Sequence, residues 1–189
     1  MNVLILGPQG AGKGTQAKRI SKEYEVPHVA TGDLFRGAIA ARTPLGLQVE
    51  PLLAAGKLVP DEVTIELMRH ELTEADGFVL DGFPRNIAQA EALDAMLEEI
   101  EKPLAIVLLL ELDESVCRER LLKRARDEGR PDDTPAVIDE RLATYHRETE
   151  PVVDHYLATG KLVKVHAERS IDEVWAEIQD ALEQVQARA

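Results

Sequence analysis

The chain has 189 residues, a length suited to one compact domain with a sizeable hydrophobic core. Its formal net charge of −13 disfavours nucleic-acid binding, because proteins of that class are usually basic. A single cysteine, Cys117, excludes a disulfide framework within the chain and fits a reducing compartment. The sequence has no basic leader and no apolar run of membrane-spanning length, so we expect a soluble, cytoplasmic protein.

The first predicted elements are a strand over residues 2–6 and a helix over about 13–25, with a glycine-rich stretch between them. Residues 7–15 read Gly-Pro-Gln-Gly-Ala-Gly-Lys-Gly-Thr. Glycines at this place let backbone N–H groups surround a phosphate, the helix N-terminus adds partial positive charge, and the lysine adds a full one. The stretch therefore predicts a phosphate-binding loop. In the general pattern Ser or Thr follows the lysine directly, whereas here Gly14 intervenes and Thr15 carries the hydroxyl.

A second short strand, residues 26–29, precedes two small helices within residues 31–60, which we expect to form an inserted helical flap. His28 lies in that strand among apolar neighbours, so we predict a packed, structural histidine. Thr31 or Asp33 can cap the helix that follows, and capping is the preferred interpretation for Asp33. Arg36 lies one turn into this helix, where a cation gains nothing from the helix dipole, which suggests an external anion as its partner.

A helix over about 61–74 leads to the third strand, residues 77–81, which ends on Asp81. A carboxylate at the end of a strand beside a phosphate loop can hold magnesium, directly or through water. Arg85 follows at the same strand end, after a tight turn. Because ligands of open α/β sheets bind at this edge, we predict a functional role for Arg85 rather than a solvated surface position.

The rest of the chain alternates between helices and strands, with one polar loop between two of the helices: 86–99 (helix), 104–110 (strand), 113–129 (helix), 130–135 (loop), 136–156 (helix), 161–165 (strand) and 170–185 (helix). The nearly all-apolar run 104–110 is typical of a central strand buried on both faces of a parallel sheet. Five strands alternating with helices predict an α/β fold with helices on both faces of the sheet.

Seven arginines lie between residues 118 and 147 of this acidic chain. A solvated pair of helices held by salt bridges is one explanation, because acidic residues are interleaved with the arginines. The alternative is a mobile flap around the polar loop whose base gathers four cations: Arg120, Arg124, Arg130 and Arg141. Opposite a phosphate loop, such a cluster would neutralise charge on a phosphoryl group being transferred.

Several motifs in this order make the chain resemble the adenylate kinase family in its short-lid form, essentially from end to end. The motifs are residues 7–16, 31–36, 57–60, 81–85 with Gln89, 120–124, Arg130 with Asp132 and Asp133, and Arg141. The resemblance implies a P-loop NTPase-type, five-stranded parallel sheet in a single domain, 1–189, with an NMP-binding insertion at 31–60 and a short lid at 127–136. It also implies reversible, magnesium-dependent phosphoryl transfer from ATP to AMP, giving two ADP and maintaining adenine nucleotide balance.

The resemblance also implies roles for individual residues. Those expected to bind ATP are Gly10, Ala11, Gly12, Lys13, Gly14, Thr15, Arg120 and Arg124. Those expected to bind AMP are Thr31, Arg36, Lys57, Leu58, Val59, Gly82, Arg85, Gln89, Arg130 and Arg141. Those expected to act in catalysis are Lys13, Arg85, Arg120, Arg124, Arg130 and Arg141. Asp81 would hold magnesium through water.

Long-lid members of the family carry an inserted lid, often with four cysteines that bind zinc, and this chain lacks both, so we expect no zinc. The expected cofactor is Mg²⁺, with ATP as co-substrate. We expect the protein to be a monomer whose partners are the small-molecule substrates ATP and AMP, and we expect it to bind neither nucleic acid nor a membrane. Gln9 stands where many members have a second proline, a change that we expect to be mild. The attacking phosphate oxygen is already anionic near neutral pH, so catalysis needs no general base and rests on alignment and charge neutralisation.

Three other functions compete with this interpretation. A UMP/CMP kinase shares the fold, but members of that family usually have alanine at the position of Thr31. A GTP switch or other regulatory module without catalysis is the second, but neither Asn2 nor Asn86, the only asparagines, lies in a guanine-binding Asn-Lys-x-Asp motif. A small-molecule kinase such as shikimate kinase is the third, and the Gly-Phe-Pro-Arg sequence at 82–85 favours the nucleotide family over it.

Overall fold

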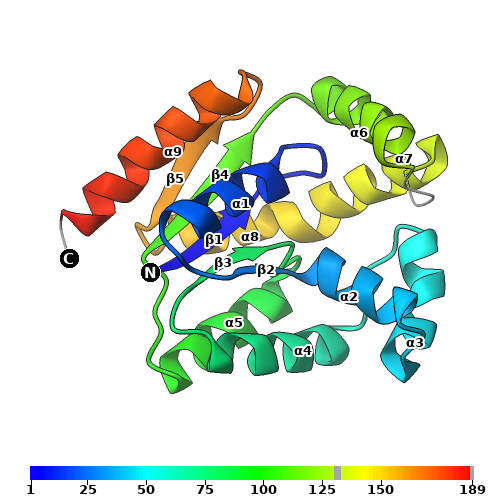
Figure 1. Cartoon of the computed structure of the whole chain (residues 1–189), viewed down its shortest axis with the longest axis horizontal. Helices are drawn as coiled ribbons and strands as arrows, with labels where there is room; N and C mark the ends of the chain where they lie inside the picture. The colour runs from blue at the N-terminus through cyan, green and yellow to red at the C-terminus, as the bar shows by residue number, and fades with distance from the viewer. Residues whose placement is uncertain (130–132, 188–189) are drawn as a thin grey trace.

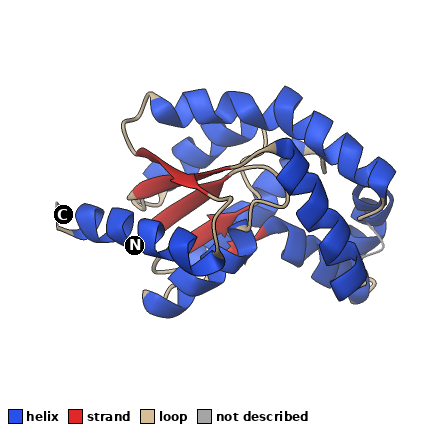
Figure 2. Cartoon of the chain, turned by 90° about the horizontal axis from the view of Figure 1, so that it is seen from above, coloured by secondary structure: helices blue, strands red, loops and turns tan. Residues whose placement is uncertain are grey.

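The computed structural model describes residues 1–129 and 133–187. These residues form a five-stranded, all-parallel sheet with the strand order β2–β3–β1–β4–β5 and helices on both of its faces (Figures 1 and 2). The strands are β1 (Asn2–Leu6), β2 (His28–Ala30), β3 (Phe78–Asp81), β4 (Ile106–Glu111) and β5 (Leu162–His166). The predicted α/β fold is confirmed.

The helices fall into layers around this sheet. Their bounds are α1 (Lys13–Glu23), α2 (Thr31–Ala40), α3 (Pro44–Ala54), α4 (Asp61–Glu74), α5 (Ile87–Glu99), α6 (Glu114–Glu128), α7 (Pro135–Thr144), the π-helix η1 (Tyr145–Thr149), α8 (Glu150–Leu157) and α9 (Ile171–Gln186). One face of the sheet packs on α4, α5 and α8, and the other packs on α1 and α9. Helices α2 and α3 form a lobe at one side of the molecule (Figure 1). No helix of the described residues is both long and apolar enough to cross a membrane.

The two faces of the sheet are set by the alternation of apolar side chains along its central strands. In β1, Leu4 and Leu6 join the core beside α4, α5 and α8, while Val3 and Ile5 join the core beside α1 and α9. Since helices cover both faces of the sheet, the central strands carry apolar residues at successive positions. These continuous apolar stretches are the reason why the strands could be predicted from the sequence.

We predicted one continuous helix over 136–156, and this prediction is wrong in one respect, because the π-helix η1 separates α7 from α8. The N–H of Glu150 bonds to the carbonyl of Tyr145, five residues earlier. Pro151 follows in the first turn of α8. A proline has no N–H, and its ring collides with the carbonyl four residues before it in an α-helix, so the wider π-turn accommodates it.

Lys102 closes the C-terminal end of α4. Its ammonium donates to the carbonyls of Leu72 (3.2 Å), Thr73 (2.8 Å) and Ala75 (2.6 Å). The last carbonyls of a helix have no N–H partner within the helix, so a cation at this place supplies both hydrogen bonds and opposite charge.

We expect Lys102→Met to lower the free energy of unfolding by about 1–3 kcal/mol, because three carbonyls, two of them partly buried, lose their donor together. Urea denaturation measures the change. The exposed Lys22→Met is the matched control and should cost less than about 0.5 kcal/mol. Equal stability of the two variants would show that water replaces the ammonium at no cost.

Candidate functional site

A cleft of about 720 Å³ opens at the carboxyl ends of the strands. Its walls come from the loop after β1, from α2 and the segment after α3, from the turn after β3, from α6 and α7, and from the loop after β5. This is the edge at which ligands bind in open α/β sheets. The cleft brings together distant parts of the sequence, most of which carry the predicted site residues.

The phosphate loop between β1 and α1 depends on its glycines. Gly7, Gly10 and Gly12 have φ angles of +138°, +86° and +89°, which residues with a side chain rarely adopt. A Cβ on Gly7 would lie 2.6 Å from the carbonyl oxygen of Leu110. Helix α1 starts at Lys13 without a side-chain cap, so the N–H groups of its first turn remain available to an anion.

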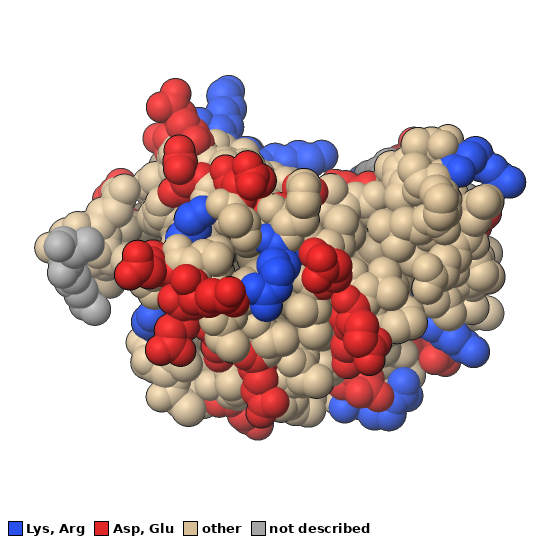
Figure 3. Space-filling view, turned by 90° about the horizontal axis from the view of Figure 1, so that it is seen from below, with Lys and Arg blue, Asp and Glu red and all other residues tan. Residues whose placement is uncertain are grey.

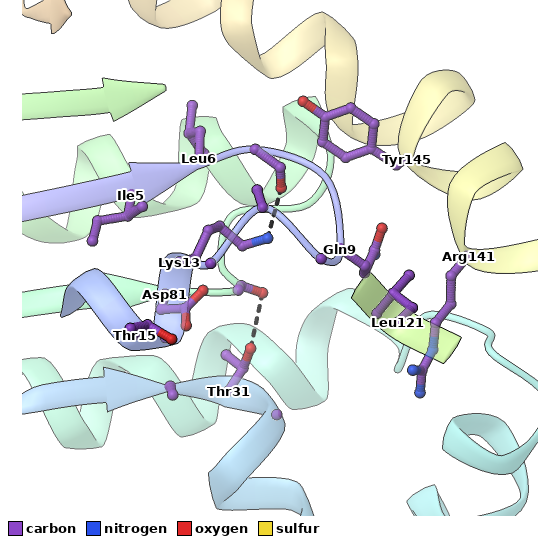
Figure 4. Close-up of a pocket in the computed structure, with 18 of the residues that line it drawn as sticks. Ile5, Leu6, Gln9, Lys13, Thr15, Thr31, Asp81, Leu121, Arg141 and Tyr145 are labelled. Atoms are coloured by element: carbon purple, nitrogen blue, oxygen red, sulfur yellow. Dashed lines mark hydrogen bonds between the residues drawn. The ribbon is translucent and has the colours of Figure 1, made fainter. Parts of the chain in front are cut away.

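The side chain of Lys13 folds back into this loop. Its ammonium donates to the carbonyls of Gly7 (2.7 Å) and Pro8 (2.8 Å), and Figure 4 shows it held inside the loop beside Asp81. Removal of the ammonium from water lowers the pKa of Lys13 to about 8. Asp81 opposes this shift by attraction, and repulsion from Arg85 and Arg124 contributes to it. The loop therefore holds a cation whose charge an incoming phosphate would stabilise.

Asp81 ends β3 next to the phosphate loop, paired in register with Ile5 of β1 and Ala30 of β2. Its Oδ2 lies 3.6 Å from Nε2 of His28 and 3.5 Å from the place that a Cβ on Gly14 would take. His28 is partly buried in β2, as we expected of a structural histidine, but it also lines the cleft, and among the described residues Nε2 has no hydrogen-bond partner. We did not predict that it lies beside Asp81, although pairing of β2 with β3 would have indicated it.

A magnesium ion would fit this arrangement. Mg²⁺ usually keeps several waters and takes one or two carboxylates together with the phosphate oxygens of a substrate. Asp81 supplies one partly buried carboxylate beside the loop that would hold those phosphates. Within the described residues, no three His, Cys, Asp or Glu side chains gather closely enough to hold a metal by themselves.

The capping role that we preferred for Asp33, and considered for Thr31, is wrong. The N-cap of α2 is Ala30, whose side chain cannot cap, because the helix starts directly from the end of β2 and Thr31 is already helical. Thr31 is buried, and its hydroxyl donates instead to the carbonyl of Gly82 at 2.8 Å (Figure 4). Asp33 accepts from the guanidinium of Arg36 at 2.6 Å. Arg36 also lines the cleft, where an external anion could reach it, so that interpretation stays a prediction.

The turn after β3 holds Arg85 against the floor of the cleft. Its Nε donates to the carbonyl of Gly82 at 2.6 Å, and its backbone N–H donates to Oε1 of Gln89 at 2.8 Å. Burial is the main cause that lowers the pKa of Arg85, and the nearby guanidiniums of Arg141 and Arg36 add to the shift. Three cations thus face the same part of the cleft.

The remaining residues predicted to contact AMP lie on the wall formed by α3, α4 and α5. Gln89 is buried, and its Nε2 donates to Asp61 at 2.7 Å, so both ends of its amide are engaged. Lys57, Leu58 and Val59 follow α3 and line the cleft. The side chain of Val59 is buried in the small core of the α2–α3 lobe, which leaves mainly backbone of this residue for a ligand.

Two of the predicted arginines meet at one buried acid. Asp133 accepts from Nε and Nη2 of Arg124 at 2.7 and 2.8 Å and from Nη1 of Arg141 at 2.7 Å, and its side chain is fully buried. Arg120 lies apart and donates to the carbonyls of Ala167 (2.8 Å) and Glu168 (3.2 Å) in the loop after β5. The predicted Arg130, together with Asp132, lies outside the described residues.

Two walls of the cleft escaped our sequence analysis. One is formed by the loop between β5 and α9 with the start of α9. The buried Gln16 of α1 reaches it, because its Nε2 donates to the carbonyl of Ile171 at 3.0 Å. The other is η1, from which Tyr145 lines the cleft and the hydroxyl of Thr149 donates to the carbonyl of Arg85 at 2.7 Å. The rule that ligands bind at strand ends would have indicated the first wall, since the loop follows the end of β5.

The cations of the cleft contrast with the acidic exterior. Figure 3 shows one face of the molecule with Asp and Glu side chains spread widely across it. A chain with a net charge of −13 that binds phosphates must concentrate its cations, and Lys13, Arg36, Arg85, Arg124 and Arg141 all line the cleft. Such focusing attracts anionic ligands to the cleft while the exterior remains acidic.

Comparison with known proteins identifies the family. Residues 5–161 match the family model described as adenylate kinase. An adenylate kinase of a Cyanothece species is 45% identical over 186 residues, covering 97% of this chain and 95% of that protein. An adenylate kinase of Xanthomonas campestris pv. campestris is 44% identical over 185 residues, covering 96% of this chain and 99% of that protein. The chain therefore belongs to the adenylate kinase family of enzymes, and its activity is phosphoryl transfer between ATP and AMP.

Proposed function

We propose that the cleft carries out this transfer with ATP along the phosphate loop and AMP against the α2–α3 lobe, reversibly and with Mg²⁺. The observation that carries the proposal is the gathering of Lys13, Arg85, Arg124 and Arg141 around one cleft of an otherwise acidic protein. Two nucleotides need two sets of phosphate-binding cations. We assign Lys13 of the phosphate loop to ATP, and Arg36 and Arg85 on the side of the α2–α3 lobe to AMP.

On the donor side, the N–H groups of residues 10–15 and the ammonium of Lys13 would hold the ATP phosphates. Arg120 and the loop between β5 and α9 form the wall beyond α1, which would receive the ATP nucleoside. Gln16 ties that wall to α1 through its bond to Ile171. Bound Mg²⁺ would neutralise part of the ATP charge, with Asp81 holding one of its water ligands.

On the acceptor side, Arg36 and Arg85 would bind the AMP phosphate. Thr31 donates its hydroxyl proton to Gly82, so its oxygen can only accept from a ligand. The exocyclic amine of adenine is such a donor, whereas uracil presents a carbonyl instead. This geometry supports AMP over UMP as the acceptor, with Gln89 and the backbone at 57–59 framing the base.

The chemistry would then require little beyond alignment. A phosphate oxygen of AMP attacks the terminal phosphoryl group of ATP, and the bond from that phosphorus to the bridging oxygen breaks, which leaves ADP on both sides. Arg124 and Arg141 would neutralise the charge of the phosphoryl group in transit. We also propose that the enzyme is a monomer in the cytoplasm, without zinc.

ADP formation from MgATP with AMP, UMP, CMP or dTMP as the acceptor tests this assignment. We expect fast turnover with AMP alone. Preference for UMP or CMP would keep the fold and the phosphate chemistry but overturn the role of Thr31. ATP binding without turnover for any acceptor would point to a regulatory module.

The lowered pKa of Lys13 predicts a pH effect on ATP binding. In the free protein about half of the Lys13 side chains are neutral near pH 8, and phosphate binding favours the charged form. ATP binding at pH 8.5 should therefore take up a proton, while binding at pH 6.5 should not. Calorimetry in two buffers of different ionisation enthalpy measures this uptake, and Lys13→Met should abolish it. Equal proton uptake at both pH values would contradict the lowered pKa.

A further inference from the structure

Gln9 is a polar residue of the phosphate loop to which the proposed function gives no role, although it lines the cleft. It lies in a turn that is closed by the hydrogen bond from the N–H of Ala11 to the carbonyl of Pro8 at 3.2 Å. Gly10, the third residue of this turn, has a φ of +86°, which is the pattern of a type II turn with Gln9 in second place. Proline suits that second place, so this chain has a hydrogen-bonding side chain where backbone geometry does not require one.

The turn is fixed against α6. A Cβ on Gly10 would lie 2.7 Å from the carbonyl oxygen of Cys117, so the loop backbone and the helix backbone are in direct contact. Figure 4 shows the side chain of Gln9 on the side of the loop that faces Leu121 and Arg141. Gln9 therefore projects between the phosphate loop and the helices that carry Arg124 and Arg141.

The amide of Gln9 has an unused acceptor. Its Oε1 is buried, and among the described residues no N–H or O–H donates to it. A buried amide oxygen without a donor destabilises the protein unless a partner arrives when a ligand binds. The neighbouring Lys13 differs, because the carbonyls of Gly7 and Pro8 satisfy its ammonium.

We propose that the Gln9 amide contacts the phosphoryl group in transit. Its NH₂ group donates to an oxygen of that phosphoryl group, and its Oε1 accepts from a guanidinium of α6 or α7 that approaches the same group. Gln9 forms no covalent bond and transfers no proton. It adds a neutral, directional donor to a site whose other ligands act mainly by charge. This inference rests on the proposed function, since it requires a phosphoryl group to pass between the two nucleotides.

Steady-state kinetics of two variants tests the proposal. Gln9→Met keeps the length of the side chain and removes the amide, while Gln9→Glu keeps one oxygen and replaces the donor by a negative charge. The matched control is Gln184→Met, which makes the same change at an exposed position of α9. For each variant we would measure kcat and the KM values for MgATP and AMP, together with Tm.

We expect Gln9→Met to lower kcat by about ten- to a hundredfold, the range of one hydrogen bond to a charged group, with KM for AMP changed less than about threefold. Gln9→Glu should lower kcat at least as much, because a carboxylate repels phosphate. Both variants should keep the wild-type Tm, and Gln184→Met should match the wild type throughout.

A kcat of Gln9→Met within about twofold of the wild type would overturn the contact, as would a loss of activity explained by a lower Tm. The wild-type measurement separates this inference from the one on which it rests. A wild-type chain that makes no ADP from ATP and AMP refutes the proposed function and the contact together. If the wild type is active and Gln9→Met has the same kcat, only the proposed contact of Gln9 is refuted.

Discussion

Replacing Arg85 by alanine should lower kcat by about 100- to 1,000-fold, the usual effect of removing one preorganised group that stabilises transition-state charge. Arg85 lies at the floor of the cleft, and burial together with Arg36 and Arg141 lowers its pKa. Asp81 offsets part of this shift by attraction, but a buried guanidinium beside two others is still costly for the free protein, because like charges repel at short distance. Phosphate relieves that repulsion, so the guanidinium is poised for an anion.

The fold should survive this substitution, because the backbone of Arg85 keeps two structural contacts and only the bond from Nε to the carbonyl of Gly82 is lost. Its N–H donates to Gln89, and its carbonyl accepts from Thr149, neither of which needs the guanidinium. Arg69→Ala, which removes an exposed arginine paired with Glu99, is the matched control for kcat and Tm. Near-normal turnover of Arg85→Ala would refute the role given to it, and a large fall in Tm would show that the guanidinium is structural.

The second large effect is expected at Asp133, whose replacement by asparagine should lower the free energy of unfolding by about 2–4 kcal/mol. The carboxylate is fully buried and accepts three hydrogen bonds from Arg124 and Arg141. Removing its charge leaves two neighbouring guanidiniums without this buried carboxylate. We expect kcat to fall as well, because the two arginines lose the group that orients them.

Asp139→Asn is the matched control for this prediction, since Asp139 pairs with Arg118 at an exposed position. Exposed ion pairs contribute at most about 1 kcal/mol, so the control should remain close to the wild type in denaturant unfolding. If Asp133→Asn and Asp139→Asn both unfold with the wild-type free energy, Asp133 does not stabilise the pair formed by Arg124 and Arg141. If stability falls while kcat does not, Asp133 supports the fold without positioning the arginines for catalysis.

The sequence predicted the strands and the phosphate loop well because each rests on a local signal. The apolar run of β4 and the glycines before Lys13 need no knowledge of distant residues. The second strand was placed about two residues too early, at 26–29 instead of His28–Ala30, because a strand of three residues offers little periodicity. The π-helix was missed because Pro151 lies in a helical pattern that otherwise continues.

The site was predictable in its parts but less so in its contacts. The arginines were found by their number in an acidic chain, yet Asp133 as their common partner depends on how α6 and α7 meet. The capping prediction for Asp33 followed a sound local rule, but the direct passage from β2 to α2 left no place for a capping side chain. The loop after β5 could have been expected at the cleft from the strand-end rule, but its contact with α1 depends on tertiary structure.

The close packing at Gly46 in the α2–α3 lobe limits the kinds of substitution that could change the preference for an acceptor nucleotide. A Cβ on Gly46 would overlap the backbone of Ala38, so the start of α3 touches the end of α2 without any side chain between them. Two helices in backbone contact can shift only as one body. New acceptor nucleotides would therefore be accommodated by exchanging side chains such as Thr31, whereas even alanine at Gly46 would disturb the lobe for every acceptor alike.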